Sequence, residues 1–381
     1  MRIVVAPDSF KGSLTAIEAA EHIAAGVRQA APESEVQCFP IADGGEGTAA
    51  TLIRATGGHW VPARVKDPLF REIDSGYGVL GDGVTAVVEL ASASGLPLLT
   101  LQERNPLVTT TYGTGQLILA ALTAGYRKIL IGLGGSATHD GGAGLLEALG
   151  VRFYTAEGFQ FSPRGCDLGS IARFDASALR QLAGDAVFVV ACDVDNPLCG
   201  PQGAAAVFAP QKGASKAQVA VLEDQLCSFG RLLERELDCR LITLPGGGAA
   251  GGVGAALCGF LQGRLLSGID LVLAYAGLEQ ALAQADLVFT GEGRLDGQTL
   301  HGKAPLGVAR AAYRRGVPVI ALGGSLGSGA EVLLQAGFTE LHGLVGPETS
   351  LEEALQKGGP LLEALARRVM EAWIRRREIS E

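Results

Sequence analysis

The sequence predicts an α/β protein built on parallel sheets, because five apolar runs each stop at a loop that combines glycine with a carboxylate. These loops begin at Ala6, Ala42, Gly134, Ala191 and Thr290. The strands of a parallel sheet end together at one edge, where ligands bind in folds of this class. Glycine lets backbone N–H groups approach phosphate, and carboxylates hold Mg²⁺ or accept a proton. The pattern therefore indicates phosphate chemistry at a sheet edge.

Length and composition set the first limits. A chain of 381 residues is long for one hydrophobic core, which favours two domains. Hydrophobic residues make up 48% of the chain, but they come in strand-length runs that are too short to span a membrane. The N-terminal segment resembles a first strand more than a signal peptide, so we expect a cytoplasmic protein. A net charge of −9 disfavours nucleic acid as a partner.

The seven cysteines, an odd number, are spread along the chain without a C-x-x-C pair. In a cytoplasmic protein this pattern favours reduced thiols, most of them buried. We therefore expect neither disulfides nor a zinc site.

The two ends of the chain share a β-α rhythm. Residues 2–7 resemble a strand, and Thr15 with Glu18 forms a capping box that predicts a helix. A strand near 35–41 and a second helix follow. The rhythm returns with a strand at 286–290, a helix near 305–315 and a strand at 317–322.

The middle of the chain has a different pattern of predicted strands and helices. Residues 72–80 and 84–91 resemble antiparallel strands joined across a glycine turn. Further on, the pattern predicts helices near 114–124 and 215–236 and strands at 128–133 and 187–191.

This contrast suggests a discontinuous domain. We assign residues 1–58 and 286–381 to one α/β domain and residues 59–285 to an inserted, mixed α/β domain. A sequential split of the chain into two domains is the alternative.

Two pairs of charged residues follow the first two strands. Asp8 and Lys11 lie directly after the first strand, where one loop offers a carboxylate and an ammonium to the same pocket. Asp43 and Glu46 bracket two glycines, and a shared cation or substrate hydroxyls would relieve their repulsion. The alternative for both pairs is a turn with solvated side chains.

The glycine-rich run 132–144 is the strongest candidate for a phosphate cradle, since a strand enters it and a helix leaves it with exposed N–H groups. The phosphate-binding residues are expected to be Gly134, Gly135, Ser136, Thr138, Gly141 and Gly142. His139 in the same run is either a general base or a hydrogen-bonding group of the loop.

Asp193 and Asp195 end another strand. Their spacing puts both on one side of an extended segment, which suits Mg²⁺ or the acceptance of a hydroxyl proton. The structural alternative is an Asx-turn before Pro197, which would account for the presence of one aspartate but not easily of both.

The segment after Gly291 is dense in charge. It contains Glu292, Arg294, Asp296, His301 and Lys303. Residues 297–304 nearly match the Walker A pattern, but Ala304 replaces the hydroxyl residue that would hold Mg²⁺, so we assign no P-loop. Lys303 can still serve a phosphate from a helix start.

Residues 246–251 fit the G-x-G-x-x-G pattern of a dinucleotide site. A run of glycines matches this pattern by chance, and Asp270 is expected to begin a strand instead of ending one. NAD binding is kept as an alternative.

Taken together, these motifs resemble the signatures of type I glycerate kinases. The matching segments, in chain order, are APDSFKGSLTA, ADGGEGT, GLGGSATHDGGAG, ACDVDNPLCG and TGEGRLDGQTLHGK. The resemblance spans nearly the whole chain and implies ATP-dependent phosphorylation of D-glycerate at the 2-hydroxyl, with Mg²⁺. It also implies a flavodoxin-like (Rossmann-like) parallel-sheet domain and an inserted second α/β domain, with the active site in the cleft between them.

For this reaction we assign roles from phosphoryl transfer, in which positioning and charge neutralisation dominate. The expected catalytic residues are Asp193, Lys11 and Lys303. The expected glycerate contacts are Asp8, Asp43, Glu46, Arg71 and Arg294, with the two arginines competing for the substrate carboxylate. The expected Mg²⁺ ligands are Asp193, Asp195, Glu292 and Asp296, and the glycine-rich run would hold the ATP phosphates.

Two functions of other classes stay open from the sequence. One is an NAD-dependent oxidoreductase acting on a small hydroxy acid, and the other is a non-catalytic sensor of small acids. The oligomeric state has no signal in the sequence.

Overall fold

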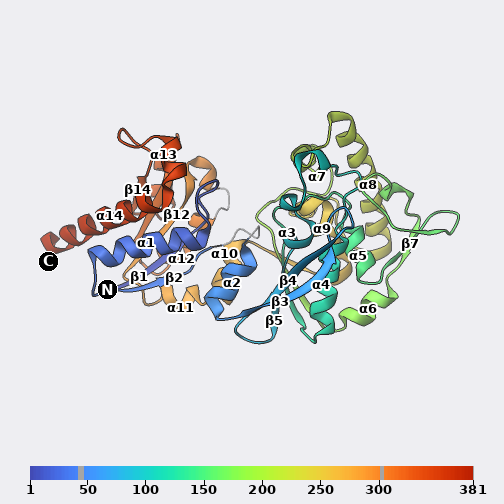
Figure 1. Cartoon of the computed structure of the whole chain (residues 1–381), viewed down its shortest axis with the longest axis horizontal. Coiled ribbons are helices and arrows are strands. Elements are labelled where there is room, and N and C mark those ends of the chain that lie inside the picture. The colour runs from blue at the N-terminus through green and yellow to red at the C-terminus, as the bar shows by residue number, and fades with distance from the viewer. Residues whose placement is uncertain (42–46, 301–303, 381) are drawn as a thin grey trace. The chain divides into compact units, whose positions relative to one another are not determined.

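The computed structural model describes residues 1–41, 47–300 and 304–380 of the chain (Figure 1). Packing separates the chain into two compact units. Unit 1 comprises Met1–Asp43 and Gly268–Glu381, and unit 2 comprises Gly44–Ser267.

Unit 1 contains a five-stranded sheet and its helices. The strands are β1 (Arg2–Pro7), β2 (Glu35–Cys38), β12 (Leu287–Leu295), β13 (Val319–Leu326) and β14 (Glu340–Gly343). The helices are α1 (Ala16–Ala30), α10 (Gly268–Tyr275), α11 (Leu278–Leu282), α12 (Ala304–Tyr313), α13 (Leu351–Gln356) and α14 (Gly358–Ser380).

The topology of this sheet is flavodoxin-like. All paired strands run parallel, in the spatial order β14-β13-β12-β1-β2. Counted along unit 1, this is the order 2-1-3-4-5, which reverses between β1 and β12. Ligands of such sheets bind outside the carboxyl ends of the strands at this point of reversal. The α/β class and the flavodoxin-like sheet predicted for the chain are therefore confirmed.

Nearly continuous burial marks β1 and β12 as central strands, because helices cover both faces of a parallel sheet. Ile3 and Val5 of β1 are buried in one core with Phe289 of β12. The helices α1 and α14, which lie side by side in Figure 1, close this face of the sheet with residues such as Leu362. Helix α12 packs against β1, β12 and β13.

Unit 2 is built on a six-stranded mixed sheet. The strands are β3 (His59–Lys66), β4 (Glu72–Val79), β5 (Thr85–Glu89), β6 (Lys128–Gly132), β10 (Val187–Ala191) and β11 (Arg264–Leu266), and a small second sheet contains β7 (Arg152–Tyr154), β8 (Gln160–Phe161) and β9 (Arg173–Asp175). The helices are α2 (Thr48–Thr56), α3 (Ala91–Ser94), α4 (Tyr112–Thr123), α5 (Ala143–Ala148), α6 (Ser177–Ala183), α7 (Ala204–Phe208), α8 (Lys216–Leu237) and α9 (Ala249–Leu261).

The larger sheet has the order β11-β10-β6-β5-β4-β3. Its first four strands pair in parallel, and β4 pairs antiparallel with both β5 and β3. The antiparallel pair predicted across the glycine turn is thus confirmed as β4 and β5. The small sheet, of order β8-β7-β9, is antiparallel.

The predicted capping box is present at the start of α1. Glu18 N donates to Thr15 Oγ1 at 3.2 Å, and Thr15 N donates to the Glu18 carboxylate at 2.8 Å. A second box, in which Gln218 takes the place of glutamate, starts α8 at Ser215. Both boxes satisfy backbone N–H groups that a helix start leaves without partners.

The two units divide the chain at other positions than the predicted domains of residues 1–58 plus 286–381 and 59–285. Helix α2 packs against β3, β4 and β5 of unit 2, and α10 and α11 pack against α12 of unit 1. Both predicted boundaries fall later in the chain than the divisions between the units. The spacing of apolar residues predicts that a segment is a helix, but it does not predict which sheet the helix packs against.

Two expectations about local structure are wrong. Asp270, expected at the start of a strand, lies in helix α10. Cys199 and Cys227, expected as thiols, form a disulfide across a sequence separation of 28. The packing of α8 against the loop after β10 brings their Cα atoms to 5.8 Å, and cysteine spacing alone does not reveal such a tertiary contact.

Among the described helices, none combines the length and the apolar composition needed to cross a lipid bilayer.

Helix α1 approaches α14 so closely that Gly26 is expected to tolerate no side chain. A Cβ added at Gly26 would lie 2.1 Å from the Glu363 carbonyl oxygen. Gly26→Ala must therefore push the helices apart, and we expect a loss of about 1–3 kcal/mol, seen as a lower thermal denaturation midpoint. Gly346→Ala is the matched control, since nothing lies within 4 Å of its added Cβ. Equal midpoints for the two variants would contradict this packing.

Candidate functional site

The first candidate group lies in unit 1, where the sheet order reverses. Asp8 follows β1, and its N–H donates to the Gly291 carbonyl oxygen of β12 at 2.8 Å. A Cβ added at Gly293 would lie 3.1 Å from Lys11 N, so the loop after β1 runs beside β12. Phe10, buried in the core, anchors this loop and leaves Lys11 exposed. Asp8 and Lys11 therefore stand at the carboxyl edge, as predicted from their place after the strand.

The end of β12 supplies the other charged groups of this edge. Glu292 is 6% exposed, and its Oε1 accepts a hydrogen bond from Thr299 Oγ1 at 2.7 Å. Arg294 Nε lies 3.0 Å from Asp296 Oδ2, with 65% of the arginine side chain exposed. Because the Arg294 guanidinium is largely in solvent, its remaining N–H groups can meet an anion.

The structure thus gathers five predicted residues at one edge of unit 1: Asp8, Lys11, Glu292, Arg294 and Asp296. Three other predicted residues, Asp43, Glu46 and Lys303, lie outside the described residues, as does His301. The roles of all eight stay predictions.

The second candidate group lies in unit 2, at the carboxyl ends of β5, β6 and β10. Gly132 of β6 pairs with Glu89 of β5 on one side and with Ala191 of β10 on the other, so the three strands end at one level. Asp193 and Asp195 follow β10 and are both exposed. The same loop is held by Asn196, whose Nδ2 donates to the Gln202 carbonyl oxygen at 2.8 Å. Two solvent-facing carboxylates therefore stand at this edge, as the sequence predicts.

The glycine-rich run after β6 has an open part and an enclosed part. Gly134 is half-buried, and Gly135, at φ 73°, is exposed. Ser136 is 7% exposed and forms a bridge to Gly95, and Thr138 is fully buried. Only the Gly134–Gly135 turn presents backbone to solvent in this conformation, so it is the part of the predicted cradle that a phosphate can reach.

Asp140 holds the enclosed part together. Its buried carboxylate accepts hydrogen bonds from Thr111 N at 2.8 Å and Thr111 Oγ1 at 2.9 Å. It also accepts from Gly142 N at 3.1 Å and Gly144 N at 3.2 Å, at the start of α5. A carboxylate that accepts several N–H groups stabilises a helix start and fixes the loop before it.

Gly141 and Gly142 serve packing in this conformation. Both have positive φ, 60° and 76°. An added Cβ would meet the Phe229 ring at 2.9 Å at the first and Ala256 Cβ at 2.8 Å at the second. These two glycines let α8 and α9 approach the loop, and their predicted contact with phosphate stays a prediction.

A buried lysine, Lys212, completes this loop. It ends the short 3₁₀ segment Pro210–Lys212, is 2% exposed, and donates from Nζ to Ser136 Oγ at 2.8 Å and to the Thr138 carbonyl oxygen at 2.6 Å. Burial lowers the pKa of Lys212 to about 7, and the nearby Asp140 opposes that shift.

His139 lies inside the same loop and is fully buried. Burial lowers the pKa of His139 to about 3, and the charge of Lys212 adds to this effect. Within the described part of the chain neither ring nitrogen has a hydrogen-bond partner. An enclosed, neutral imidazole does not exchange protons with a ligand at the surface, which argues against the general-base interpretation of His139.

Lys212 and Asp140 are the groups of this region that sequence reasoning missed. Lys212 follows no strand and carries no motif, so only its burial reveals it. Asp140 lies inside the quoted motif, but residue type and spacing do not reveal that its carboxylate accepts from four donors.

Arg71, the second arginine considered for the substrate carboxylate, is already paired. Its Nε lies 2.5 Å from Asp67 Oδ2, and its Nη1 lies 2.7 Å from Glu103 Oε1. Hydrogen bonds to Asp67 and then to Glu103 raise the pKa of Arg71. Arg71 therefore pairs with two carboxylates and Arg294 with one, Asp296, and the role of either arginine toward a substrate stays a prediction.

The glycine run at 246–251 has no dinucleotide geometry. It leads from a turn, not from a strand, into α9, and Ala250, Gly251 and Gly252 adopt left-handed backbone angles there. A Cβ at Gly251 would lie 2.4 Å from the Thr138 carbonyl oxygen, so this run packs against the loop after β6. The feature that suggested NAD binding is thus a packing contact.

Comparison with known proteins agrees with the motifs. A family model described as "Glycerate kinase family" matches residues 3–374. The chain is 46% identical over 367 residues to a protein of Halalkalibacterium halodurans named glycerate kinase, covering 96% of this chain and 97% of that one. It is 44% identical over 356 residues to glycerate 2-kinase of Escherichia coli, covering 93% of each. The crystal structure of a protein described as glycerate kinase 2 of Salmonella typhimurium LT2 matches with a TM-score of 0.87 and 43% identity, covering 99% of both chains.

Replacing Lys212 by methionine is expected to change how stability depends on pH. The pKa of Lys212 falls on folding from 10.5 to about 7, so between these values the unfolded chain binds a proton that the folded chain lacks. This contribution to the free energy of unfolding therefore rises with pH above about 7 in the wild type and is missing in the variant.

The measurement is urea unfolding of wild type and Lys212→Met at about pH 7 and about pH 9.5. Lys216→Met, which removes an exposed lysine of α8, is the matched control. If the difference between wild type and Lys212→Met stays constant over this range, the assigned ionisation of Lys212 is wrong.

Proposed function

The chain belongs to the glycerate kinase family, and we propose that it transfers the terminal phosphoryl group of ATP to the 2-hydroxyl of D-glycerate, giving 2-phospho-D-glycerate and ADP. Glycerate kinase activity follows from the family and from relatives that match nearly end to end. The name of the Escherichia coli relative, glycerate 2-kinase, supports the position of transfer. ATP as donor fits the glycine turn and the carboxylates at strand ends.

The observation that carries this proposal is the charged edge at the reversal point of the unit 1 sheet. A small hydroxy acid carries one carboxylate and neighbouring hydroxyls, and this edge offers a cation and acceptors for them. The Arg294 guanidinium, largely exposed, suits a bidentate pair with the substrate carboxylate. Lys11 is exposed in the adjacent loop and Asp8 is half-buried beside it, within reach of hydroxyl groups.

We assign the proton and metal chemistry to Asp193 and Asp195. Both carboxylates are exposed in one loop at the end of β10, which fits a cation that takes oxygen ligands and keeps several waters. Mg²⁺ bound there would neutralise charge on the ATP phosphates. Asp193 would in addition accept the hydroxyl proton of glycerate as the oxygen attacks. Glu292 and Asp296, at the edge of unit 1, are also proposed to bind Mg²⁺, although each has a partner within that unit.

The remaining groups position the phosphates. The exposed Gly134–Gly135 turn offers backbone N–H groups to them, with Asp140 and Lys212 fixing the loop from behind. Of the other residues predicted there, Ser136 is nearly buried, and Thr138, Gly141 and Gly142 are buried. We therefore propose that they shape the turn.

Lys11 and Lys303 would stabilise the charge that develops on the transferred group, and Asp43 with Glu46 would bind glycerate hydroxyls. We place this ATP-consuming reaction in the cytoplasm.

Asp193→Asn is expected to lower kcat by about 10²- to 10⁴-fold, because an amide accepts no proton and binds Mg²⁺ weakly. The readout is glycerate-dependent ADP formation, with circular dichroism to show an intact fold. Asp185→Asn is the matched control, since this aspartate is 93% exposed just before the amino end of the same strand. Turnover near the wild-type value in Asp193→Asn would remove this residue from the chemistry.

Arg294→Ala is expected to raise the KM for D-glycerate by about ten- to a hundredfold with a smaller change in the KM for ATP, because a charge-assisted pair is lost. Arg314→Ala, an exposed arginine of the same unit, is the control and should behave as wild type. If the KM for glycerate rises in Arg71→Lys and not in Arg294→Ala, the carboxylate clamp is Arg71.

A further inference from the structure

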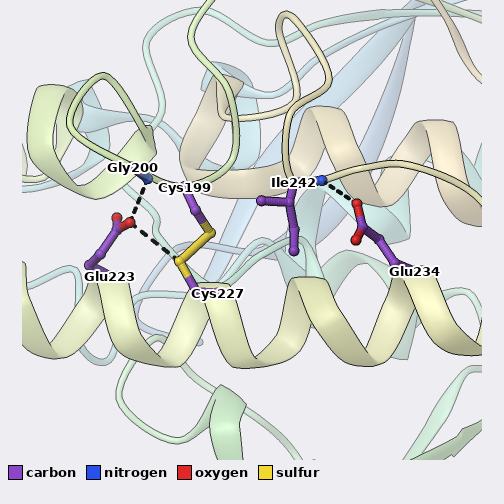
Figure 2. The surroundings of a disulfide bond; sticks show 6 residues. All are labelled: Cys199, Gly200, Glu223, Cys227, Glu234 and Ile242. Carbon is purple, nitrogen blue, oxygen red and sulfur yellow. Dashed lines mark hydrogen bonds between the residues drawn. A yellow bond between two sulfur atoms is a disulfide. The ribbon is translucent and has the colours of Figure 1, made fainter.

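The loop after β10 is joined to helix α8 by a cluster of three side chains. Cys199 lies in the loop, and Glu223 and Cys227 lie four residues apart on α8, so they share one face of the helix. In Figure 2 the Glu223 carboxylate and both sulfur atoms point toward one another. One ligand atom from each residue lies within 4.8 Å of the other two.

The Glu223 carboxylate is held in place and is only half satisfied. Its Oε1 accepts from Gly200 N at 2.6 Å and lies 3.3 Å from Cys227 Sγ (Figure 2). Its Oε2 is enclosed and has no hydrogen-bond partner among the residues that the structure describes. An enclosed carboxylate oxygen without a partner is costly, and a proton or a cation would remove that cost.

Two sulfurs and a carboxylate at this spacing form a donor set of a recognisable kind. Zinc binds cysteine thiolates and carboxylates, usually with four ligands, whereas Mg²⁺ prefers oxygen alone. Two thiolates and one carboxylate carry three negative charges, which a divalent cation would largely offset. No other trio of His, Cys, Asp or Glu in the described ranges brings its ligand atoms this close.

We propose that Cys199, Glu223 and Cys227, once their disulfide is reduced, form a binding site for a thiophilic divalent cation such as zinc. Solvent or a buffer molecule would complete the coordination, as in zinc sites with three protein ligands. This site uses none of the residues assigned to glycerate or ATP and does not depend on their assignment.

The chemistry has two balanced steps. A dithiol reductant transfers two electrons and two protons to the Cys199–Cys227 bond, which breaks, and the reductant becomes a disulfide. The cation then displaces the two thiol protons into solvent and forms two metal–sulfur bonds. Because disulfides are rare in the cytosol and mostly transient there, a reducible pair fits the compartment in which ATP is used.

The scaffold around the cluster is suited to a preorganised site. Glu223 and Cys227 are fixed by a helix of 22 residues. The Gly200 N–H that orients Glu223 comes from a residue at φ 102°, a backbone angle that favours glycine. Backbone groups that orient a ligand in this way strengthen metal sites by about ten- to a hundredfold.

The test is a Cd²⁺ titration of the full-length protein after reduction with a phosphine, which leaves no competing thiol. Cadmium thiolates have a charge-transfer band in the ultraviolet, and we expect this band to saturate at one equivalent in the wild type. Cys227→Ser should lose the high-affinity band, and Glu223→Gln should bind at least about tenfold more weakly. Cys166→Ser, which removes an exposed free cysteine, is the control and should titrate as wild type.

A band of wild-type strength in Cys227→Ser, or wild-type affinity in Glu223→Gln, would overturn the proposal.

A second measurement needs no variant. Zn²⁺ added to the reduced wild type should slow alkylation of Cys199 and Cys227 at least about tenfold, as mapped by peptide mass spectrometry, while Cys166 reacts as before. Equal alkylation of Cys199 and Cys227 with and without Zn²⁺ would also overturn it.

Discussion

The parallel pairing of β1 with β12 is the interaction on which the candidate site of unit 1 depends. It joins residues 3–7 to residues 287–291, from opposite ends of the chain, in a continuous register. Asp286 adds to the pairing by accepting from Arg2 N at 2.7 Å. Because the two strands end at the same edge, the loop with Asp8 and Lys11 meets the segment with Glu292 and Arg294. Without this register, the charged groups after β1 would not meet those of β12.

In unit 2 the corresponding constraint is a buried polar network. Asp140 accepts from four donors, and Lys212 donates to Ser136 and to the Thr138 carbonyl oxygen. Buried charges are costly unless they are paired and hydrogen-bonded, so a loop that is bonded to two of them is tightly determined. The network holds the exposed Gly134–Gly135 turn in a fixed shape, which is what a phosphate-binding turn requires.

The glycine-rich run after β6 has two structurally different parts, where the sequence suggested one. Only the first glycines of that run face solvent, and the later ones let helices α8 and α9 pack closely. Glycine is required in both settings, for backbone approach in one and for helix approach in the other. Composition alone therefore does not separate the solvent-facing part of this loop from the part that packs against helices.

Patterns along the sequence predicted the parts that depend on local chemistry. The capping box at Thr15, the antiparallel pair β4 and β5, and the acidic residues after β1, β10 and within β12 all follow from spacing and residue type. Tertiary contacts decided the rest. Lys212 is defined by its burial, the Cys199–Cys227 disulfide by the packing of α8, and the assignment of α2 to unit 2 by the strands that it covers. None of these three leaves a periodic trace in the sequence.

The central claim is the transfer of a phosphoryl group from ATP to the 2-hydroxyl of D-glycerate. The most direct measurement is ³¹P NMR of the products formed by the purified protein with ATP, Mg²⁺ and D-glycerate. The account predicts the resonance of 2-phosphoglycerate growing in step with that of ADP. A resonance of 3-phosphoglycerate, or ADP without any phosphoglycerate, would contradict it.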